Sequence, residues 1–251
     1  MIPKIQKANV QTVTTEEMIE VDRAMMEDYR ITLPQMMENA GRSLASLTRG
    51  AFLQGCAEDR RILVMAGAGG NGGGALVGAR HLANWGARVC VFLAQPSDKM
   101  SSVAGHQRSI LDEMGVDLIT PEDHHKRRDE FKTADVILDG LIGYSLKGAP
   151  AGPTAQLILD ANKSSAPIIA LDVPSGIDAH SGEIFDPAII AKATLTLALP
   201  KTGLLATTIK KNIGTLYCAD ISVPTSLYEK YLGRQIPTLF SQSEIVEINL
   251  E

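Results

Sequence analysis

The sequence predicts an α/β protein with one doubly wound, mostly parallel sheet, in a Rossmann-like three-layer α/β/α arrangement with two N-terminal helices. Short apolar runs alternate with segments of helical periodicity through most of the chain, which is typical of parallel strands buried on both faces by helices. The 251 residues are 45% hydrophobic, which is enough to bury one core. No internal repeat or Pro-, Gly- or Ser-rich linker divides the chain. We therefore expect one domain over residues 1–251.

Two helices are expected before the first strand. Thr14 or Thr15 can cap the first helix, because Glu16 and Glu17 follow in its first turn and an apolar stripe runs behind them. The second helix is expected to begin at Pro34, since proline suits the first turn. Methionine packs flexibly, either in a core or at a homodimer contact, and we favour the core for four of them: Met25, Met26, Met36 and Met37.

Beyond these helices, strands and helices alternate. Right-handed crossovers bring the carboxyl ends of parallel strands to one edge of the sheet, where ligands bind in this class of fold. Polar residues at the ends of strands are therefore the first candidates for a functional site. The expected strands are 61–66, 88–93, 116–119, 136–138, 167–171, 193–199 and 215–219, and the expected helices are 75–85, 102–114 and 154–162.

A glycine-rich loop follows the first of these strands. Residues 67–75 read Gly-Ala-Gly-Gly-Asn-Gly-Gly-Gly-Ala, with six glycines and one asparagine. Without Cβ atoms in the way, a phosphate can approach the main-chain N–H groups, and the start of the next helix favours its negative charge. The loop predicts binding of a phosphorylated small molecule. The alternative is a turn whose glycines only let the helix pack closely on the strand.

Two aspartates stand at the ends of later strands. Asp139 follows the strand at 136–138 and Asp172 follows the strand at 167–171, and each leads into a turn. A single aspartate at such a position is more often a turn or cap residue. Two of them, together with a phosphate-type loop at the same edge of one sheet, favour a shared crevice.

The common nucleotide motifs are incomplete in this chain. Residues 67–72 satisfy G-x-G-x-x-G, but no acid stands at the end of the second strand to hold a ribose, and the next one is Asp98. This argues against a nicotinamide dehydrogenase. No Gly-Lys-Ser/Thr follows the glycines, which excludes a P-loop.

Composition argues against several other classes of protein. The net charge of −5 provides no general attraction for nucleic acid, and acidic residues flank the basic run at 124–128. Three widely spaced cysteines form neither a disulfide framework nor a zinc motif. No stretch is apolar enough to span a membrane or to serve as a secretion signal. We expect a cytoplasmic protein that binds neither nucleic acid nor membrane.

An ordered set of motifs resembles the NAD(P)H-hydrate epimerase family, the N-terminal half of bifunctional nicotinamide nucleotide repair enzymes. The likeness extends from Thr14 to about Pro224, and it is specific as a set although each motif is weak alone. The motifs are Met37-Glu38-Asn39-Ala40-Gly41, the glycine loop, Leu138-Asp139 with Gly143, Asp172-Val-Pro-Ser-Gly-Ile-Asp178, Ser181-Gly182-Glu183, and Pro200-Lys201 with Gly203.

The resemblance implies a role for each of these loops. The substrate would be hydrated NADH or NADPH, and a potassium ion would be held by hard oxygen ligands on three turns. Asp172 would contact the substrate and is our candidate catalytic residue, with Lys201 as a second. The implied substrate-binding residues are Asn39, Gly70, Asn71, Gly72, Gly73, Gly74, Gly143, Tyr144, Ser145, Leu146, Lys147, Gly148, Ala149 and Asp172, and the implied potassium ligands are Asn71, Asp139 and Ser175.

The implied reaction needs little equipment. Hydration places a hydroxyl on the ring carbon beside the ring nitrogen, and the nitrogen can help to expel it and leave an iminium ion. Water that returns to the opposite face completes the epimerisation. One carboxylate beside that carbon could stabilise the positive charge and relay a proton. The kinase-like dehydratase of many family members would be a separate polypeptide.

The glycine loop departs from the usual family pattern. Asn-Asn-Gly-Gly-Asp-Gly is common there, whereas residues 70–75 read Gly-Asn-Gly-Gly-Gly-Ala, and Tyr144-Ser145 replaces a common Thr-Gly pair. The lost acceptors could leave polar groups of the substrate unpaired, at roughly 1–3 kcal/mol each. Two alternatives therefore stay open: a non-catalytic nucleotide-binding or scaffold protein on the same fold, and an enzyme that acts on a different nucleotide.

Overall fold

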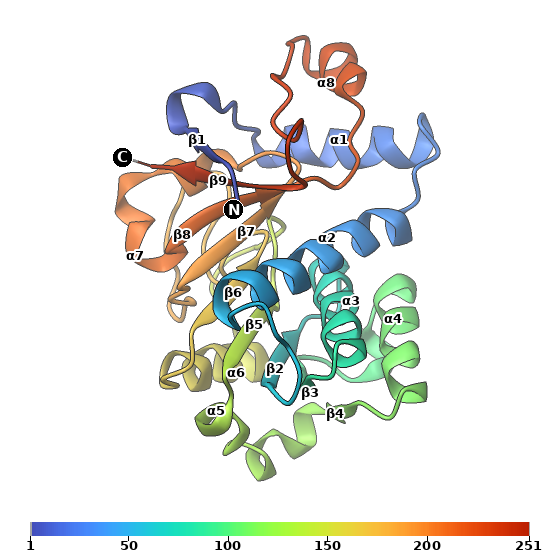
Figure 1. Ribbon diagram of the computed structural model, residues 1–251, viewed down its shortest axis with the longest axis vertical. Coiled ribbons are helices and arrows are strands. Elements are labelled where there is room, and N and C mark those ends of the chain that lie inside the picture. Colours follow the sequence, from blue (N-terminus) through green and yellow to red (C-terminus); the bar gives the residue numbers. More distant parts are fainter. Residues whose placement is uncertain (1, 251) are drawn as a thin grey trace.

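A computed structural model describes residues 2–250. These residues form a nine-stranded sheet in the order β1-β9-β8-β7-β6-β5-β2-β3-β4, with all neighbours parallel except β8 and β9 (Figure 1). The chain runs outward from β2 in one direction and returns through β5 in the other, which makes the carboxyl ends of β2 and β5 a topological switch point. The strands are β1 Lys4–Gln6, β2 Arg61–Ala66, β3 Arg88–Leu93, β4 Asp117–Ile119, β5 Val136–Gly140, β6 Ile168–Leu171, β7 Ala193–Leu197, β8 Thr215–Ala219 and β9 Ile245–Asn249.

Helices cover both faces of the sheet, as the alternating apolar runs predicted. Strand residues of one parity pack with α2, α3 and α4, while those of the other parity pack with α5 and α6. This confirms the doubly wound α/β fold. The helices are α1 Thr15–Glu27, α2 Leu33–Leu47, α3 Gly70–Asn84, α4 Ser102–Glu113, α5 Glu130–Thr133, α6 Gly152–Asn162, α7 Lys210–Ile213 and α8 Thr225–Leu232.

Caps set the first two helices where the sequence predicted them. Thr14 accepts from the backbone N–H of Glu17, and the Glu17 carboxylate accepts from the N–H of Thr14, which is a capping box. Thr32 and Gln35 repeat the arrangement at the start of α2. These caps fix the two helices that later form one wall of the site.

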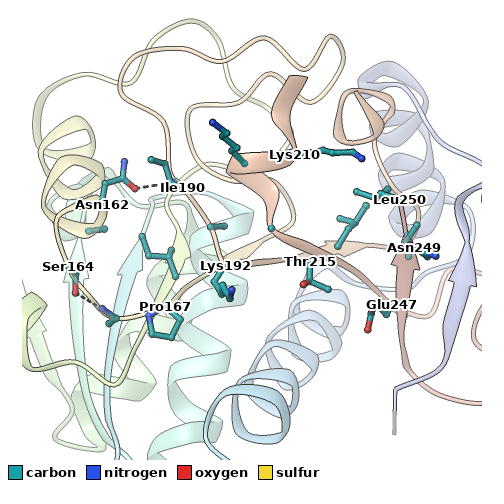
Figure 2. A pocket seen from close by; sticks show the side chains of 18 residues that line it. Asn162, Ser164, Pro167, Ile190, Lys192, Lys210, Thr215, Glu247, Asn249 and Leu250 are labelled. Atoms are coloured by element: carbon teal, nitrogen blue, oxygen red, sulfur yellow. Dashed lines mark hydrogen bonds between the residues drawn. The ribbon is translucent and has the colours of Figure 1, made fainter. Parts of the chain in front are cut away.

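The sheet extends further than the sequence predicted. The short β1 precedes α1, so the two helices do not come before the first strand, and β1 pairs with β9 at the sheet edge. Neither strand was predicted, because β1 is three residues long with two exposed side chains, and β9 follows a polar segment. A groove of about 770 Å³ lies near this edge of the sheet, beside the amino-terminal ends of β7 and β8 (Figure 2).

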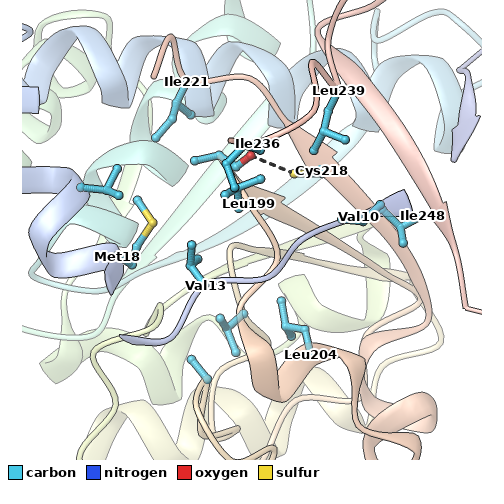
Figure 3. Packing of buried hydrophobic residues seen from close by; sticks show 14 of the residues in the cluster. Val10, Val13, Met18, Leu199, Leu204, Cys218, Ile221, Ile236, Leu239 and Ile248 are labelled. Carbon is cyan, nitrogen blue, oxygen red and sulfur yellow. Dashed lines mark hydrogen bonds between the residues drawn. The ribbon is translucent and has the colours of Figure 1, made fainter. Parts of the chain in front are cut away.

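A separate part of the core joins the ends of the chain. Met18 on α1, Val13 just before it, Leu199 after β7 and Ile236 after α8 pack together (Figure 3). This cluster holds α1 against β8 and β9, the last two strands of the chain. Helix α1 is therefore placed to cover the crevice at the strand ends.

The helix after the glycine loop begins at Gly70, not at Ala75 as predicted. The glycines form its first turn because side chains would not fit there: a Cβ on Gly72 would lie 1.9 Å from the Gly67 carbonyl oxygen, and one on Gly73 would lie 2.7 Å from Met37. The packing role that the sequence left open therefore accounts for Gly72 and Gly73. Strand β7 also ends two residues early, where Ala198 reverses the chain with a φ of 63°.

Candidate active site

A cavity of about 450 Å³ lies at the carboxyl end of the sheet, as the sequence predicted. Its floor comes from the ends of β6 and β7 and the start of α3, and its walls come from α1, α2 and the loop after β5. The cavity is mainly lined by apolar groups, with a few polar groups directed into it, which is the usual make-up of a small-molecule site. It is lined by Met18, Ile19, Asp22, Arg23, Met26, Leu33, Met36, Met37, Ala40, Gly70, Asn71, Gly74, Gly143, Tyr144, Ser145, Leu171, Asp172, Leu197, Lys201 and Ile221.

A buried ion pair stands on the cavity floor. The Lys201 Nζ donates to Asp172 Oδ1 at 2.5 Å, and both side chains are almost fully buried, at 1% and 5% exposure. Lys201 also donates to the Leu197 carbonyl at 3.0 Å. This burial shows that Lys201 is not a solvated surface lysine. The pair gives the Asp172 carboxylate a counter-charge beside the cavity.

The backbone of Asp172 is held in an uncommon conformation. Its φ is 67°, in the left-handed region that few non-glycine residues adopt, and the next residues turn away from β6. The second oxygen, Oδ2, accepts from the Tyr144 N–H at 3.2 Å. Gly143 lies against the carboxylate, since a Cβ there would be 3.1 Å from Oδ2. The loop after β5 thus binds the Asp172 carboxylate through the backbone N–H of Tyr144.

A second polar cluster lies behind the floor. Asp139 is fully buried, and it accepts from the Ser175 N–H at 2.8 Å, the Ser175 hydroxyl at 2.7 Å and the Leu141 N–H at 3.2 Å. Burial raises the pKa of Asp139 to about 6, although these hydrogen bonds oppose the shift. Asp139 belongs to β5 rather than following it, because the strand continues to Gly140.

Asn71 adjoins this cluster with its side chain unpaired. Its Oδ1 and Nδ2 are both buried and have no hydrogen-bond partner within residues 2–250. The Asn71 backbone lies near Gly140, and its side chain lies near Gly143. The three residues implied as potassium ligands therefore come from the end of β5, the first turn of α3 and the turn after β6, and two of them, Asp139 and Ser175, are hydrogen-bonded to each other. No cluster of three His, Cys, Asp or Glu side chains suited to a transition metal occurs in the described chain.

The structure adds a pair that the sequence missed. The Tyr144 hydroxyl donates to Asp22 Oδ2 at 2.5 Å, across the mouth of the cavity from the loop after β5 to α1. Burial raises the pKa of Asp22, and burial also raises that of the Tyr144 hydroxyl. One signal was present: Asp22 falls four residues after Met18, on the apolar stripe of the helix, where a carboxylate needs a partner.

Other implied substrate-binding residues lie outside the cavity lining. Gly72 and Gly73 pack inside the start of α3, and Asn39 donates to the Ser222 hydroxyl at 2.7 Å. The loop continues past Ser145 to the surface, where three of its residues are exposed. Those beyond the lining are Asn39, Gly72, Gly73, Leu146, Lys147, Gly148 and Ala149.

This fold and cavity define a class: an α/β protein with a cavity of about 450 Å³ at the carboxyl end of its sheet and a buried carboxylate within it. A family profile described as YjeF-related protein N-terminus matches residues 33–203. The chain belongs to that family.

Relatives with established names support the assignment. The chain is 43% identical over 224 residues to an NAD(P)H-hydrate epimerase of Dehalogenimonas lykanthroporepellens, covering 88% of this chain and 86% of the relative. It is 40% identical to a bifunctional NAD(P)H-hydrate repair enzyme of Moorella thermoacetica, with 86% of this chain matching 41% of that protein. The crystal structure of the yeast protein ynu0 superposes with a TM-score of 0.81 at 27% identity, over 95% of this chain and all of that one.

Proposed function

We propose that this protein is an NAD(P)H-hydrate epimerase, which interconverts the two epimers of hydrated NADH and NADPH in nicotinamide nucleotide repair. The names of its relatives support the substrate and the reaction. The observation that carries the proposal is the Asp172–Lys201 pair on the floor of a cavity at the switch point of the sheet. A carboxylate held as an anion beside the substrate ring suits a reaction that passes through a cation.

The residues divide the work between binding and chemistry. The start of α3, with Gly70 and Asn71, lines the cavity, and the first N–H groups of a helix have no partner within the helix and can bind a phosphate. The apolar side chains of α1 and α2 cover the ring and exclude water. Asp172 stabilises the iminium ion and exchanges a proton with the departing or returning oxygen, while Lys201 fixes the position and charge of the carboxylate. These assignments are predictions for substitution.

The cluster behind the floor fits the proposed potassium ion. Asp139 is a buried carboxylate without a cationic partner in the described chain, and the Asn71 side chain there lacks any partner. A cation held by Asn71, Asp139 and Ser175 would supply the missing charge and the missing contact. When bound, it would fix the position of Asn71, which lines the cavity, relative to Asp139 and Ser175 behind the floor.

The decisive experiment is a time course with chirally resolved hydrated NADH and NADPH. Each epimer is followed with and without the protein, in potassium and in a buffer whose cation is too large for the site. We expect the protein to speed interconversion well above the spontaneous rate, with potassium increasing the effect. A rate equal to that without protein would disprove the epimerase.

One observation favours the non-catalytic alternative. A side chain would fit at Gly70, where an added Cβ would lie 4.0 Å from its nearest neighbour, the Met37 methyl group, yet the usual family asparagine is absent. A scaffold protein would bind the hydrated nucleotide without turning it over, and the same time course separates the two. A separate dehydratase partner, a homodimer and a cytoplasmic location stay predictions. Within residues 2–250, no helix is both long and apolar enough to cross a bilayer.

A further inference from the structure

Tyr144 contacts two carboxylates at once. Its backbone N–H donates to Asp172 Oδ2 at 3.2 Å, and its hydroxyl donates to Asp22 Oδ2 at 2.5 Å. Both carboxylates line the same cavity. Tyr144 therefore links the two carboxylates, with its backbone at Asp172 and its hydroxyl at Asp22.

The two carboxylates lie on different sides of the cavity. Asp172 directly follows β6 on the floor, whereas Asp22 lies on α1, which covers the cavity. The Lys201 Nζ lies 5.7 Å from the centroid of the Tyr144 ring. A flat substrate ring that enters the cavity beside Tyr144 would present one face to the floor and the other to α1.

The two carboxyl groups have different charged partners. Lys201 pairs directly with Asp172 and supplies a counter-charge. Within residues 2–250, Asp22 has no such partner: Tyr144 donates to one oxygen, Lys201 and Asp172 act on it from a distance, and burial raises the pKa of Asp22 and favours its neutral acid. The nearby Arg23 is engaged with Glu20, Glu27 and Asp28. A carboxylate with a direct ammonium partner and a carboxyl group without one, both lining the same cavity, are placed to act as base and acid.

We propose that Asp22 is the second acid–base residue of the epimerase, acting on the ring face opposite Asp172 and oriented by Tyr144. The inference rests on the proposed function. In one direction Asp22 protonates the hydroxyl; the carbon–oxygen bond breaks, and its electron pair leaves with the new water molecule. The ring nitrogen lone pair forms the iminium double bond. A water molecule then attacks from the floor, the double-bond pair returns to nitrogen, and Asp172 takes the proton.

The reverse direction exchanges the roles of the two carboxyl groups, and solvent resets their protons between turnovers. Two groups explain how the hydroxyl can leave from one face and return to the other without the ring turning over. With Asp172 alone, departure and return on the floor side would regenerate the starting epimer. Inversion thus depends on both carboxyl groups, whereas exchange with retention on the floor side depends on Asp172.

The test uses one resolved epimer at a time in water enriched in oxygen-18. Inversion is measured by chromatography, and uptake of the label without inversion by mass spectrometry. For Asp22→Asn we expect inversion to fall about 100-fold, while one of the two epimers still takes up label with retention at close to the wild-type turnover rate. Tyr144→Phe, which keeps the ring, should show the same difference between inversion and label uptake, with inversion lowered about tenfold.

The matched controls are Asp28, which directly follows α1, and Tyr231 on α8. Tyr231 donates to Asp28 at 2.8 Å, a contact of the same kind outside the cavity. Asp28→Asn and Tyr231→Phe should invert and exchange like the wild type. Wild-type inversion by Asp22→Asn, or a parallel fall of inversion and exchange, would overturn the role of Asp22. If Asp22→Asn does not fold, Tyr144→Phe decides by the same two rates. A wild type without any inversion would instead disprove the epimerase itself.

Discussion

The two ends of the sheet differ in what they bury. The groove at the amino-terminal ends of β7 and β8 is the larger, at about 770 Å³ against about 450 Å³ for the cavity at the carboxyl ends. Its charged lining includes Lys192, Lys210 and Lys211, which are exposed (Figure 2). The smaller cavity has Asp172 and Lys201 buried on its floor.

The difference shows that volume does not identify a site. Charged groups are costly to bury, and a chain keeps them in a core only where they are paired or used. The carboxyl end of the sheet collects ionisable groups from separate parts of the sequence: Asp172 and Lys201 are buried on the cavity floor, Asp139 is buried behind it, and the half-buried Asp22 lines the cavity. The opposite groove is what remains between strand ends and loops, with its lysines in solvent.

The largest expected effect is that of Asp172→Asn on turnover. Asparagine tolerates the left-handed backbone at this position and keeps the shape, but it loses the charge and the proton exchange. We expect turnover to fall at least about 1000-fold, or ~4 kcal/mol. Circular dichroism should show an intact fold. Normal epimerisation by this variant would show that the Asp172 carboxylate, at the carboxyl end of β6, takes no part in the chemistry.

The next effect concerns stability. Lys201→Met leaves the Asp172 carboxylate buried without a counter-charge, and we expect it to lower the free energy of unfolding by about 3 kcal/mol. The double variant Asp172→Asn, Lys201→Met should recover part of the loss, because neither charge then remains. Chemical denaturation of the four proteins measures the coupling. Additive losses would mean that the pair contributes little, and would weaken the contrast between the two ends of the sheet.

Burial and periodicity decide how much of the fold and of the site could be predicted from the sequence. The central strands and the aspartates at 139 and 172 followed from apolar runs and turn residues. Asp22 did not, because a carboxylate on a helix is most often in solvent, and its partner Tyr144 lies 122 residues away. The edge strand β1 was missed because it is three residues long with two exposed side chains, and its neighbour β9 was missed because it follows a polar segment.

Potassium should stabilise the protein if the cluster at Asp139 binds it. A ligand present at about 100 times its dissociation constant adds ~2.7 kcal/mol to the folded state. We expect a higher unfolding temperature in potassium chloride than in a matched salt of a bulky organic cation. Ser175→Ala should abolish the difference, since it removes one ligand and a hydrogen bond to Asp139. An equal temperature in both salts would speak against the ion.

A smaller effect is expected at Gly143. A methyl group there would lie 3.1 Å from Asp172 Oδ2 and 3.3 Å from Asn71, closer than ordinary contacts, so both side chains must shift by a few tenths of an ångström. Gly143→Ala should lower turnover roughly tenfold, or ~1.4 kcal/mol. Gly105→Ala, on α4 with open space where the Cβ would stand, is the control. Equal rates would show that the loop after β5 has room to adjust.

The smallest effect belongs to the opposite groove. Lys192 and Lys210 are exposed there and no ion pair engages them in the described chain, so Lys192→Gln and Lys210→Gln remove charge without leaving a buried partner. The groove lies across the sheet from Asp172, and exposed charges at that distance are screened by salt. We expect turnover by both variants within about twofold of the wild type. A loss as large as that at Gly143 would mean that both ends of the sheet serve the reaction, and that burial of charge is not what distinguishes them.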